Sequence, residues 1–175
     1  MDCITLPTVD PGTSRSICSG DTTVLGTSPA SGYTYAWTPK NTLDDSTKSN
    51  PKAFPTTTTK YYLTVTNSSG CYKIDSVTVT VNPKPNVGSG TVSDVCVGDT
   101  ATYNLTGSYA GHTFSWQALG GVVVGASTNQ SVTVKWTRSG ADTLLAAVTN
   151  SYGCSATGKI YLTANPRSTV NASTD

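Results

Sequence analysis

The chain of 175 residues contains no glutamate, so all ten of its acidic residues are aspartates, and His112 is its single histidine. The paired glutamates that many glycosidases use as acid and base are therefore missing. Charged residues make up 12% of the chain and the net charge is +1, which leaves little of the clustered Lys and Arg that nucleic acids or anionic membranes attract. We therefore expect a protein that is neither an enzyme nor a nucleic-acid-binding protein.

Long apolar runs are also missing, since no stretch approaches the roughly 18 residues of a membrane-spanning helix. We accordingly expect no membrane insertion. The start of the chain lacks the pattern of a signal peptide, and we expect a piece of a longer protein with Met1 as an added residue. There is no C-x-x-C pair, and one histidine is too few for a zinc site, so we predict no metal and no cofactor. Asp44 and Asp45 are interpreted as solvated loop residues instead of calcium ligands.

The residues that are abundant, Thr, Ser, Val, Tyr and Gly, favour strands and turns. Apolar residues alternate with polar ones in "DSVTVTVNP" (75–83), "QSVTVKW" (130–136) and "GYTYAWTP" (32–39). Gly, Pro, Asn and Ser interrupt these runs every ten residues or so, as in a sandwich of short antiparallel strands. The sequence predicts an all-β fold.

The two halves of the chain match each other in order, which indicates a tandem repeat of about 80 residues. "ICSGDT" (17–22) matches "VCVGDT" (95–100), and "TNSSGC" (66–71) matches "TNSYGC" (149–154). Proline followed by glycine and serine in "NPKPNVGSGTVSD" is typical of a linker. The predicted division is a remnant of a preceding domain or linker at 1–14, repeat 1 at 15–84, a linker at 85–93, repeat 2 at 94–168 and a C-terminal tail at 169–175.

Four of the five cysteines hold equivalent places in the two copies, one before the first strand and one after the T-N-S-x-G turn. If the early segment runs beside the final strand, both cysteines lie at one end of the domain. We therefore predict one disulfide per domain, Cys18–Cys71 and Cys96–Cys154, with Cys3 unpaired. Buried free thiols are the alternative interpretation. Disulfides indicate an oxidising, extracellular setting.

The tryptophans fall into two groups. Trp37 and Trp116 hold corresponding places in the two copies, and we predict that both are core residues of a sandwich. Trp136 has no aromatic counterpart in the first copy, and Tyr61 and Tyr62 are neighbours in one strand, so one of them points outward. Trp136 and Tyr62 are therefore the candidates for ligand contact.

The ordered set "C-x-G-D-T", "Y-x-W" or "F-x-W", "V-T-N-S-x-G-C" and "N-P" resembles the PKD-like and Ig-like repeats of large surface proteins of gliding bacteria, which leave the cell by type IX secretion. The resemblance covers residues 15–168 and implies two tandem β-sandwich domains, an extracellular location and a role in adhesion or in spacing other modules. The chain lacks the PKD "W-x-F-G-D-G", having "WTPKN" and "WQALGG" instead. A ligand role for that loop does not carry over.

These observations favour a non-catalytic repeat module of a secreted or cell-surface adhesin that spaces or displays functional modules. Its partners would be the neighbouring repeats of the same chain. The alternative is a carbohydrate-binding module, whose partner would be a surface polysaccharide. An exposed aromatic or polar cleft would favour that alternative, because sugar binding requires one.

Overall fold

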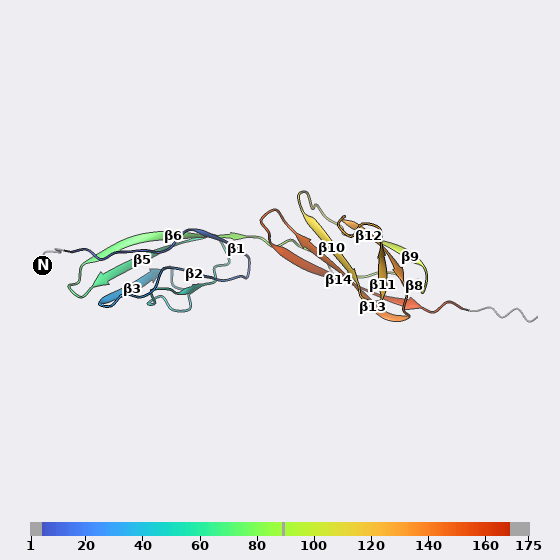
Figure 1. Ribbon diagram of the computed structural model, residues 1–175, viewed down its shortest axis with the longest axis horizontal. Helices are drawn as coiled ribbons and strands as arrows, with labels where there is room; N and C mark the ends of the chain where they lie inside the picture. Colours follow the sequence, from blue (N-terminus) through green and yellow to red (C-terminus); the bar gives the residue numbers. More distant parts are fainter. Residues whose placement is uncertain (1–4, 89, 169–175) are drawn as a thin grey trace, which may run out of the picture. The chain divides into compact units, whose positions relative to one another are not determined.

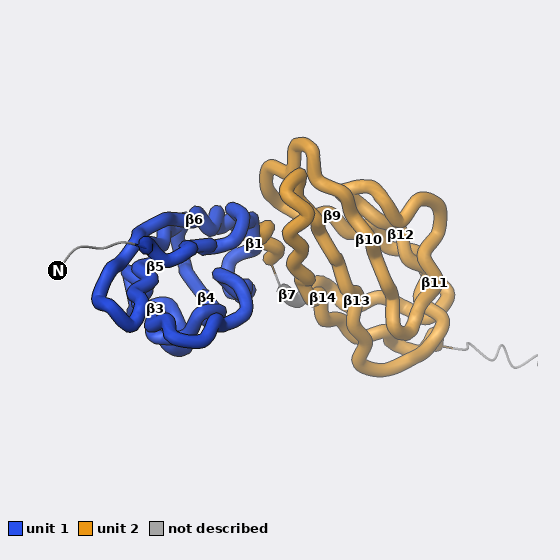
Figure 2. Tube along the Cα trace, turned by 60° about the vertical axis from the view of Figure 1, so that its left-hand side comes forward, with its two compact units in different colours: residues 1–83 blue, residues 84–175 orange. Residues whose placement is uncertain are grey.

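The computed structural model describes residues 5–88 and 90–168, and the elements assigned to these residues are all strands. The chain divides into two compact units, residues 1–83 (unit 1) and residues 84–175 (unit 2), which Figure 2 colours separately. Figure 1 shows the strands of each unit, numbered in chain order. The all-β, two-unit fold predicted from the sequence is confirmed.

Unit 1 contains one four-stranded sheet in the order β1-β6-β5-β3 and a two-stranded sheet of β2 and β4. The first strand pairs parallel to β6, and the other pairs are antiparallel. The strands are β1 (Arg15–Cys18), β2 (Thr23–Val24), β3 (Tyr33–Thr38), β4 (Lys52–Ala53), β5 (Thr59–Asn67) and β6 (Tyr72–Asn82).

The core of unit 1 follows from the alternation of its strands, because successive side chains of a strand point to opposite faces. Val77 and Val79 of β6 and Leu63 and Val65 of β5 share the buried face, where each is at most 2% exposed. Trp37 of β3 joins them there.

Unit 2 is a sandwich of two sheets (Figure 1). One sheet has the order β10-β13-β14-β7, with β8 also paired to β14, and the other has the order β11-β12-β9. The strands are β7 (Gly90–Thr91), β8 (Val95–Cys96), β9 (Thr100–Asn104), β10 (Thr113–Ala118), β11 (Gly121–Val124), β12 (Ser131–Trp136), β13 (Gly140–Thr149) and β14 (Ser155–Asn165).

The units begin earlier than the sequence predicted. In unit 1, Val9 packs against the core and the carbonyl of Pro11 accepts a hydrogen bond from Gly26 at 2.9 Å. In unit 2, Val87 packs against the core and β7 pairs with β14. The segments interpreted as a remnant (1–14) and a linker (85–93) therefore belong to the units as far as they are described. Both segments are rich in proline and glycine, as linkers are. An extended segment that runs along the edge of a unit can have the same composition. The predicted tail lies outside the described residues.

Candidate functional site

The sequence that the chain repeats, T-N-S-x-G-C, forms the same hairpin turn in both units. In unit 1 the side-chain oxygen of Asn67 accepts hydrogen bonds from the backbone N–H groups of Ser69 and Cys71, both at 3.0 Å. Gly70 has φ +80°, a conformation that a residue with a Cβ adopts only at a cost. Cys71 closes the turn, with its N–H bonded to the Asn67 side chain and its carbonyl bonded to the Asn67 N–H at 2.9 Å.

Unit 2 repeats this turn bond for bond. The side-chain oxygen of Asn150 accepts hydrogen bonds from Tyr152 at 3.1 Å and from Cys154 at 3.0 Å, and Gly153 has φ +78°. The cysteine after each turn is buried, at 3% exposure for Cys71 and 1% for Cys154. The repeated sequence T-N-S-x-G-C therefore forms a turn that is capped by its asparagine side chain and followed by a buried cysteine. We call Cys71 and Cys154 the hairpin cysteines.

A second turn is shared as well, at the C-x-G-D-T sequence. In unit 1 it follows β1, where the Ser19 N–H donates to the carbonyl of Asn82 at 2.8 Å. In unit 2 the Val97 N–H donates to the carbonyl of Asn165 at the same distance. The cysteine before each turn therefore lies beside the last residue of its unit's final strand. We call Cys18 and Cys96 the strand-end cysteines.

This placement contradicts the predicted disulfide Cys18–Cys71. Cys18 is in register with Asn82, the last residue of β6, whereas Cys71 precedes the first residue of that strand. The 11 residues of β6 separate the two cysteines by about 35 Å at roughly 3.3 Å per residue. A disulfide needs Cα atoms within about 7 Å.

The predicted disulfide Cys96–Cys154 fails for the same reason. Cys96 is in register with Asn165, and Cys154 precedes β14 at its other end. The structure agrees, because Cys96 has a free, exposed thiol while Cys18, Cys71 and Cys154 are disulfide-bonded. The prediction assumed that the first cysteine opens its strand. It closes that strand, and the parallel pairing carries it to the far end. Cys3 lies outside the described residues.

The tryptophans fill the cores. Trp37 and Trp116 are 1% and 6% exposed, and their indole N–H groups donate to the carbonyls of Lys48 at 2.9 Å and Asn129 at 2.8 Å. A buried indole N–H with a partner is the expected state of a structural tryptophan.

The prediction that Trp136 contacts a ligand is wrong, because its side chain is completely buried and so lies out of reach of a ligand. Its indole N–H donates to the Tyr103 hydroxyl at 2.8 Å, and the two rings meet edge to face. Burial is the main reason that the pKa of Tyr103 is raised. The alternation of β12 places this residue with Val132 and Val134, and that signal was present in the sequence.

Tyr62 is the ligand candidate that lies on the surface, with 46% of its side chain exposed. It points from β5 to the outer face of the sheet of unit 1, which also presents Tyr72 and Ile74 of β6. The Lys60 ammonium lies 5.4 Å from the centre of the Tyr62 ring. This face is the open aromatic surface that sequence reasoning could only partly anticipate, because exposure depends on strand pairing.

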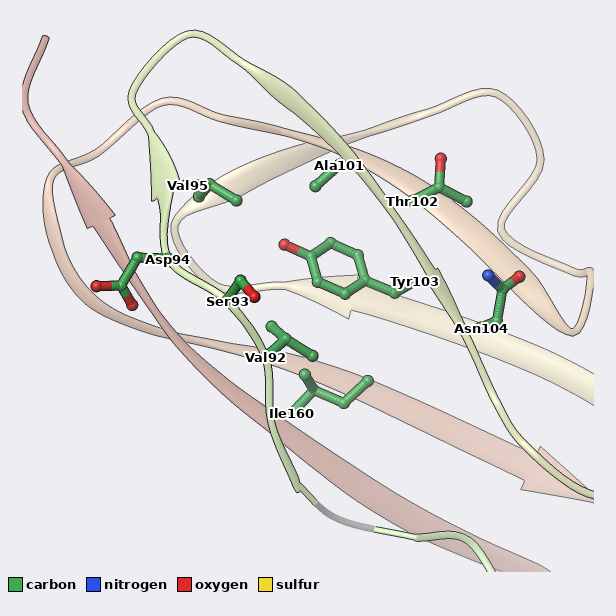
Figure 3. Close-up of a pocket in the computed structure, with 9 residues that line it drawn as sticks. All are labelled: Val92, Ser93, Asp94, Val95, Ala101, Thr102, Tyr103, Asn104 and Ile160. Carbon is green, nitrogen blue, oxygen red and sulfur yellow. The ribbon is translucent and has the colours of Figure 1, made fainter.

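Unit 2 contains a cleft of about 390 Å³ between the segment 92–95 and β9 (Figure 3). The ring of Tyr103 lies in the middle of the cleft, with Val92 and Ile160 on one side. Asp94 is the one charged residue of the lining, and its carboxylate points away from the ring. The cleft is a gap between the edges of the two sheets and contains no pair of groups suited to acid–base or nucleophilic chemistry.

Asp44 and Asp45, the adjacent aspartates of unit 1, accept hydrogen bonds from residues that follow them closely in the sequence. Asp44 accepts hydrogen bonds from the Lys48 ammonium and the Lys52 N–H, and these bonds lower its pKa. Asp45 accepts from the hydroxyl and N–H of Thr47, which lowers its pKa likewise. In the part of the chain that the structure describes, no three His, Cys, Asp or Glu side chains gather as metal ligands do.

Comparison with known proteins gives one family match and several structural likenesses. Residues 5–83 match the model of the family described as Ig-like domain, CHU_C associated. No curated protein sequence matches the chain. Among the 5–88 and 90–168 segments, none forms a helix of the length and apolarity that a membrane span requires.

Three solved structures are among those that the chain matches. The DIP-gamma IG1+IG2 structure is 12% identical, covers 87% of this chain and 94% of its own, and has a TM-score of 0.39. The insect immune protein hemolin is 17% identical, with 90% and 46% covered and a TM-score of 0.39. The fibronectin(III)-like modules of CbhA from Clostridium thermocellum are 13% identical, with 91% and 94% covered and a TM-score of 0.39.

Likenesses at these scores say nothing about function. The family match is of a different kind, because it spans unit 1 from the entry segment to the end of β6. Unit 2 repeats the turns of unit 1. Residues 5–83 are thus similar to the Ig-like domains of that family, and unit 2 is an all-β sandwich built with the same turns.

Proposed function

We propose that the two units are non-catalytic extracellular repeats of a large secreted or cell-surface bacterial protein, in which they space or display functional modules. Under the resemblance to repeats of gliding bacteria, that protein is an adhesin exported by type IX secretion. The partners of these units would be the neighbouring repeats of the same chain.

The observation that carries this proposal is what the two copies have in common. The residues that recur at matched places are the turn residues of the hairpin, Asn67 and Asn150, and the strand-end and hairpin cysteines. The two asparagines cap the backbone of the turns, and Cys18, Cys71 and Cys154 are disulfide-bonded, whereas Cys96 has a free thiol. A repeat whose shared residues serve its fold and its ends is suited to being joined in series.

The cysteines support the extracellular part of the proposal. Cys18, Cys71 and Cys154 are disulfide-bonded. Disulfides persist in oxidising surroundings such as the bacterial cell surface and the secreted state.

The test is a replacement experiment in the full-length surface protein that contains this segment. One strain lacks residues 5–168, and a second has them replaced by two unrelated disulfide-containing Ig-like domains of similar length. A spacer predicts that deletion weakens adhesion while replacement restores it. Loss of adhesion in both strains, with equal protein on the surface, would show that the repeats themselves bind.

Carbohydrate binding is the second candidate, and the exposed face of unit 1 favours it. Sugar rings stack on exposed aromatic side chains, and Tyr62 lies on the same outer face of the sheet as Tyr72. Retention of the chain on immobilised surface polysaccharide should fall in a Tyr62→Ala variant. The matched control is Tyr161→Ala in unit 2, because the two tyrosines are 46% and 47% exposed. Equal retention of both variants and the parent chain would exclude the outer face of the unit 1 sheet as a carbohydrate-binding surface.

A further inference from the structure

Unit 1 contains a pocket of about 230 Å³ between the start of β3 and the segments that precede β1 and follow β2. Tyr33 and Tyr35 of β3 line it and are each half-buried. Leu63 and Val65 of β5 lie at its base, each 1% exposed. The second sheet of this unit consists of the two-residue strands β2 and β4, so it covers only part of the inner face of the larger sheet. The pocket is therefore an opening onto the core.

The corresponding place in unit 2 also has a pocket, of about 270 Å³. The strand registers show that the two places correspond, because Tyr35 is opposite Val65 in unit 1 and Phe114 is opposite Val148 in unit 2. The lining residues then match in order along the chain. The matched pairs are Thr8 with Asn86, Ala30 with Tyr109, and Tyr33 with His112. One of these pairs differs strongly in size, because unit 1 has an alanine where unit 2 has a tyrosine.

The Tyr109 ring packs against the core of unit 2 and so separates the pocket there from the core. The ring meets His112 and Phe114 edge to face, with ring centres 5.6 Å and 5.7 Å away. Its hydroxyl donates to the carbonyl of Asn86 at 3.0 Å. A six-membered ring that carries a hydroxyl at its far end thus closes this place in unit 2.

Ala30 leaves the same place open in unit 1. Its backbone N–H donates to the Tyr35 hydroxyl at 2.9 Å, which holds the loop against the strand. The tyrosine hydroxyl keeps its own proton, which it can donate to a ligand. Pockets for drug-sized ligands usually begin at about 300 Å³, so a volume of about 230 Å³ suits one ring and not a chain of rings. Unit 1 therefore has room for one ring from outside at the place where unit 2 supplies its own.

The polar side chains of the unit 1 pocket decide which kind of ring fits. The Asp10 carboxylate accepts the Gly12 N–H at 2.9 Å through Oδ1, and none of the described residues donates to its Oδ2. The Ser49 side chain is buried, and its bond to Asn50 is long, at 3.4 Å. An aromatic ring would remove water from both groups without offering a hydrogen bond in return, which is costly. The hydroxyls of a sugar ring offer a hydrogen bond to each.

We propose that the pocket of unit 1 binds a single neutral pyranose ring of a glycan. The C–H groups of the ring pack on Tyr33 and Tyr35, while ring hydroxyls donate to the Asp10 carboxylate and bond to the Ser49 hydroxyl. Asp10 is the charged residue of the lining and disfavours acidic sugars by like-charge repulsion. The pocket opens on the inner face of the sheet, whereas Tyr62 lies on its outer face. The proposal stands or falls independently of the spacer function, because a spacer needs no ligand.

Amide chemical shifts of the nitrogen-15-labelled full chain test the site directly. The probes are the methyl glycosides of glucose, galactose, mannose, rhamnose and N-acetylglucosamine, with methyl glucuronide as an acidic pyranoside. We expect one or more neutral glycosides to shift the Ala30 and Tyr35 amides saturably, while the Tyr109 and His112 amides of unit 2 stay in place. Methyl glucuronide should shift the unit 1 amides less than the best neutral glycoside does. If none of the neutral glycosides moves these amides, the proposal is wrong.

Ala30→Tyr places in unit 1 the residue that closes this place in unit 2. The added ring should occupy the pocket and weaken glycoside binding at least about tenfold, measured on the Tyr35 amide. The control is Ser31→Tyr, which adds the same side chain at the next residue of the loop, outside the lining, and should bind as the parent chain does. Unshifted amides of the Asn67 turn report that both variants are folded. Full binding by a folded Ala30→Tyr variant would refute the proposal.

Asp10→Asn tests the carboxylate. Asparagine keeps an acceptor for the Gly12 N–H but has no charge, and a hydrogen bond to a charged acceptor is about twice as strong as one to a neutral acceptor. We expect the best neutral glycoside to bind about tenfold more weakly, and its advantage over methyl glucuronide to shrink. The matched control is Asp94→Asn, which removes an exposed carboxylate from unit 2 and should leave binding unchanged. Unchanged binding in Asp10→Asn would show that the carboxylate does not hold the sugar, contrary to the proposal.

Two other outcomes would reassign the ligand or the surface. N-acetyltyrosinamide presents a tyrosine side chain as a free molecule. If it shifts the Tyr35 amide and no glycoside does, the pocket takes an aromatic side chain of a partner protein. Tyr62→Ala should leave glycoside binding unchanged, and lost binding in this variant with binding retained in Ala30→Tyr would place the sugar on the outer face. Either result overturns the proposal.

Discussion

The buried pair of Tyr103 and Trp136 leads to a prediction about the stability of unit 2. The indole N–H donates to the tyrosine hydroxyl at 2.8 Å, and the ring centres lie 6.2 Å apart with planes at 89°. Tyr103→Phe keeps the ring and removes the acceptor, so that a completely buried N–H has no partner. An unsatisfied buried donor costs about 1–3 kcal/mol. For a unit of this size that lowers the melting temperature by roughly 5–20 °C.

The same substitution changes the dependence of stability on pH. Burial raises the pKa of Tyr103 above the ordinary value of 10.0, although the Trp136 hydrogen bond acts in the opposite direction. The unfolded chain therefore loses this proton at a lower pH than the folded chain does. The stabilisation is complete below about pH 10 and is lost as the pH rises through the folded-state pKa. Tyr103→Phe removes this loss, so its deficit relative to the parent should shrink above pH 10.

Hydrogen exchange of the full chain in increasing urea, followed on peptides of β12, measures unit 2 separately from unit 1. Tyr161→Phe is the control, because it removes a hydroxyl from an exposed ring on β14 of the same unit. If Tyr103→Phe lowers the free energy of unfolding of unit 2 no more than Tyr161→Phe does at neutral pH, the hydrogen bond does not stabilise the core. An unchanged deficit above pH 10 would refute the titration argument alone.

Two further substitutions test unit 1. Gly26→Ala should cost more than about 3 kcal/mol, because the residue has φ +63° and a Cβ would lie 2.1 Å from the Ser49 carbonyl oxygen. Gly32→Ala is the control, with φ +80° and open space around it, and should cost about 1–2 kcal/mol; equal losses in urea unfolding would contradict the steric argument. Asn67→Ala removes the acceptor of the Cys71 N–H and should cost about 1 kcal/mol, and an unchanged unfolding midpoint would show that water replaces it.

Local pattern was enough to predict several strands of this chain and two of its core tryptophans, Trp37 and Trp116. The alternation in "DSVTVTV" places Val77 and Val79 on one face, and both are buried in the structure. Trp37 and Trp116 have the matched positions and flanking alternation of core residues, and both are buried. These features depend on neighbours within one strand, which is the range over which a sequence pattern determines direction.

Features that depend on which strands pair were predicted less well. Trp136 was set apart because the first copy has no aromatic residue there, yet its strand alternation already placed it with Val132 and Val134 in the core. The linker at 85–93 was assigned from proline and glycine, but the segment pairs with β14. A stretch that pairs along one edge needs no apolar alternation, so composition does not separate it from a linker.

The cysteines show why two copies of a repeat were insufficient for the sequence argument. In the sequence, a first strand parallel to the last one and a first strand antiparallel to it both have one cysteine near the first strand and one after the last hairpin. The decisive quantity is the direction of β1 relative to β6, because an antiparallel first strand would place Cys18 at the other end of the unit, nearer Cys71. The parallel register, with Arg15 opposite Val79 and Cys18 opposite Asn82, places Cys18 at the exit instead. Spacing in the sequence does not contain that direction, and strand pairing decides it.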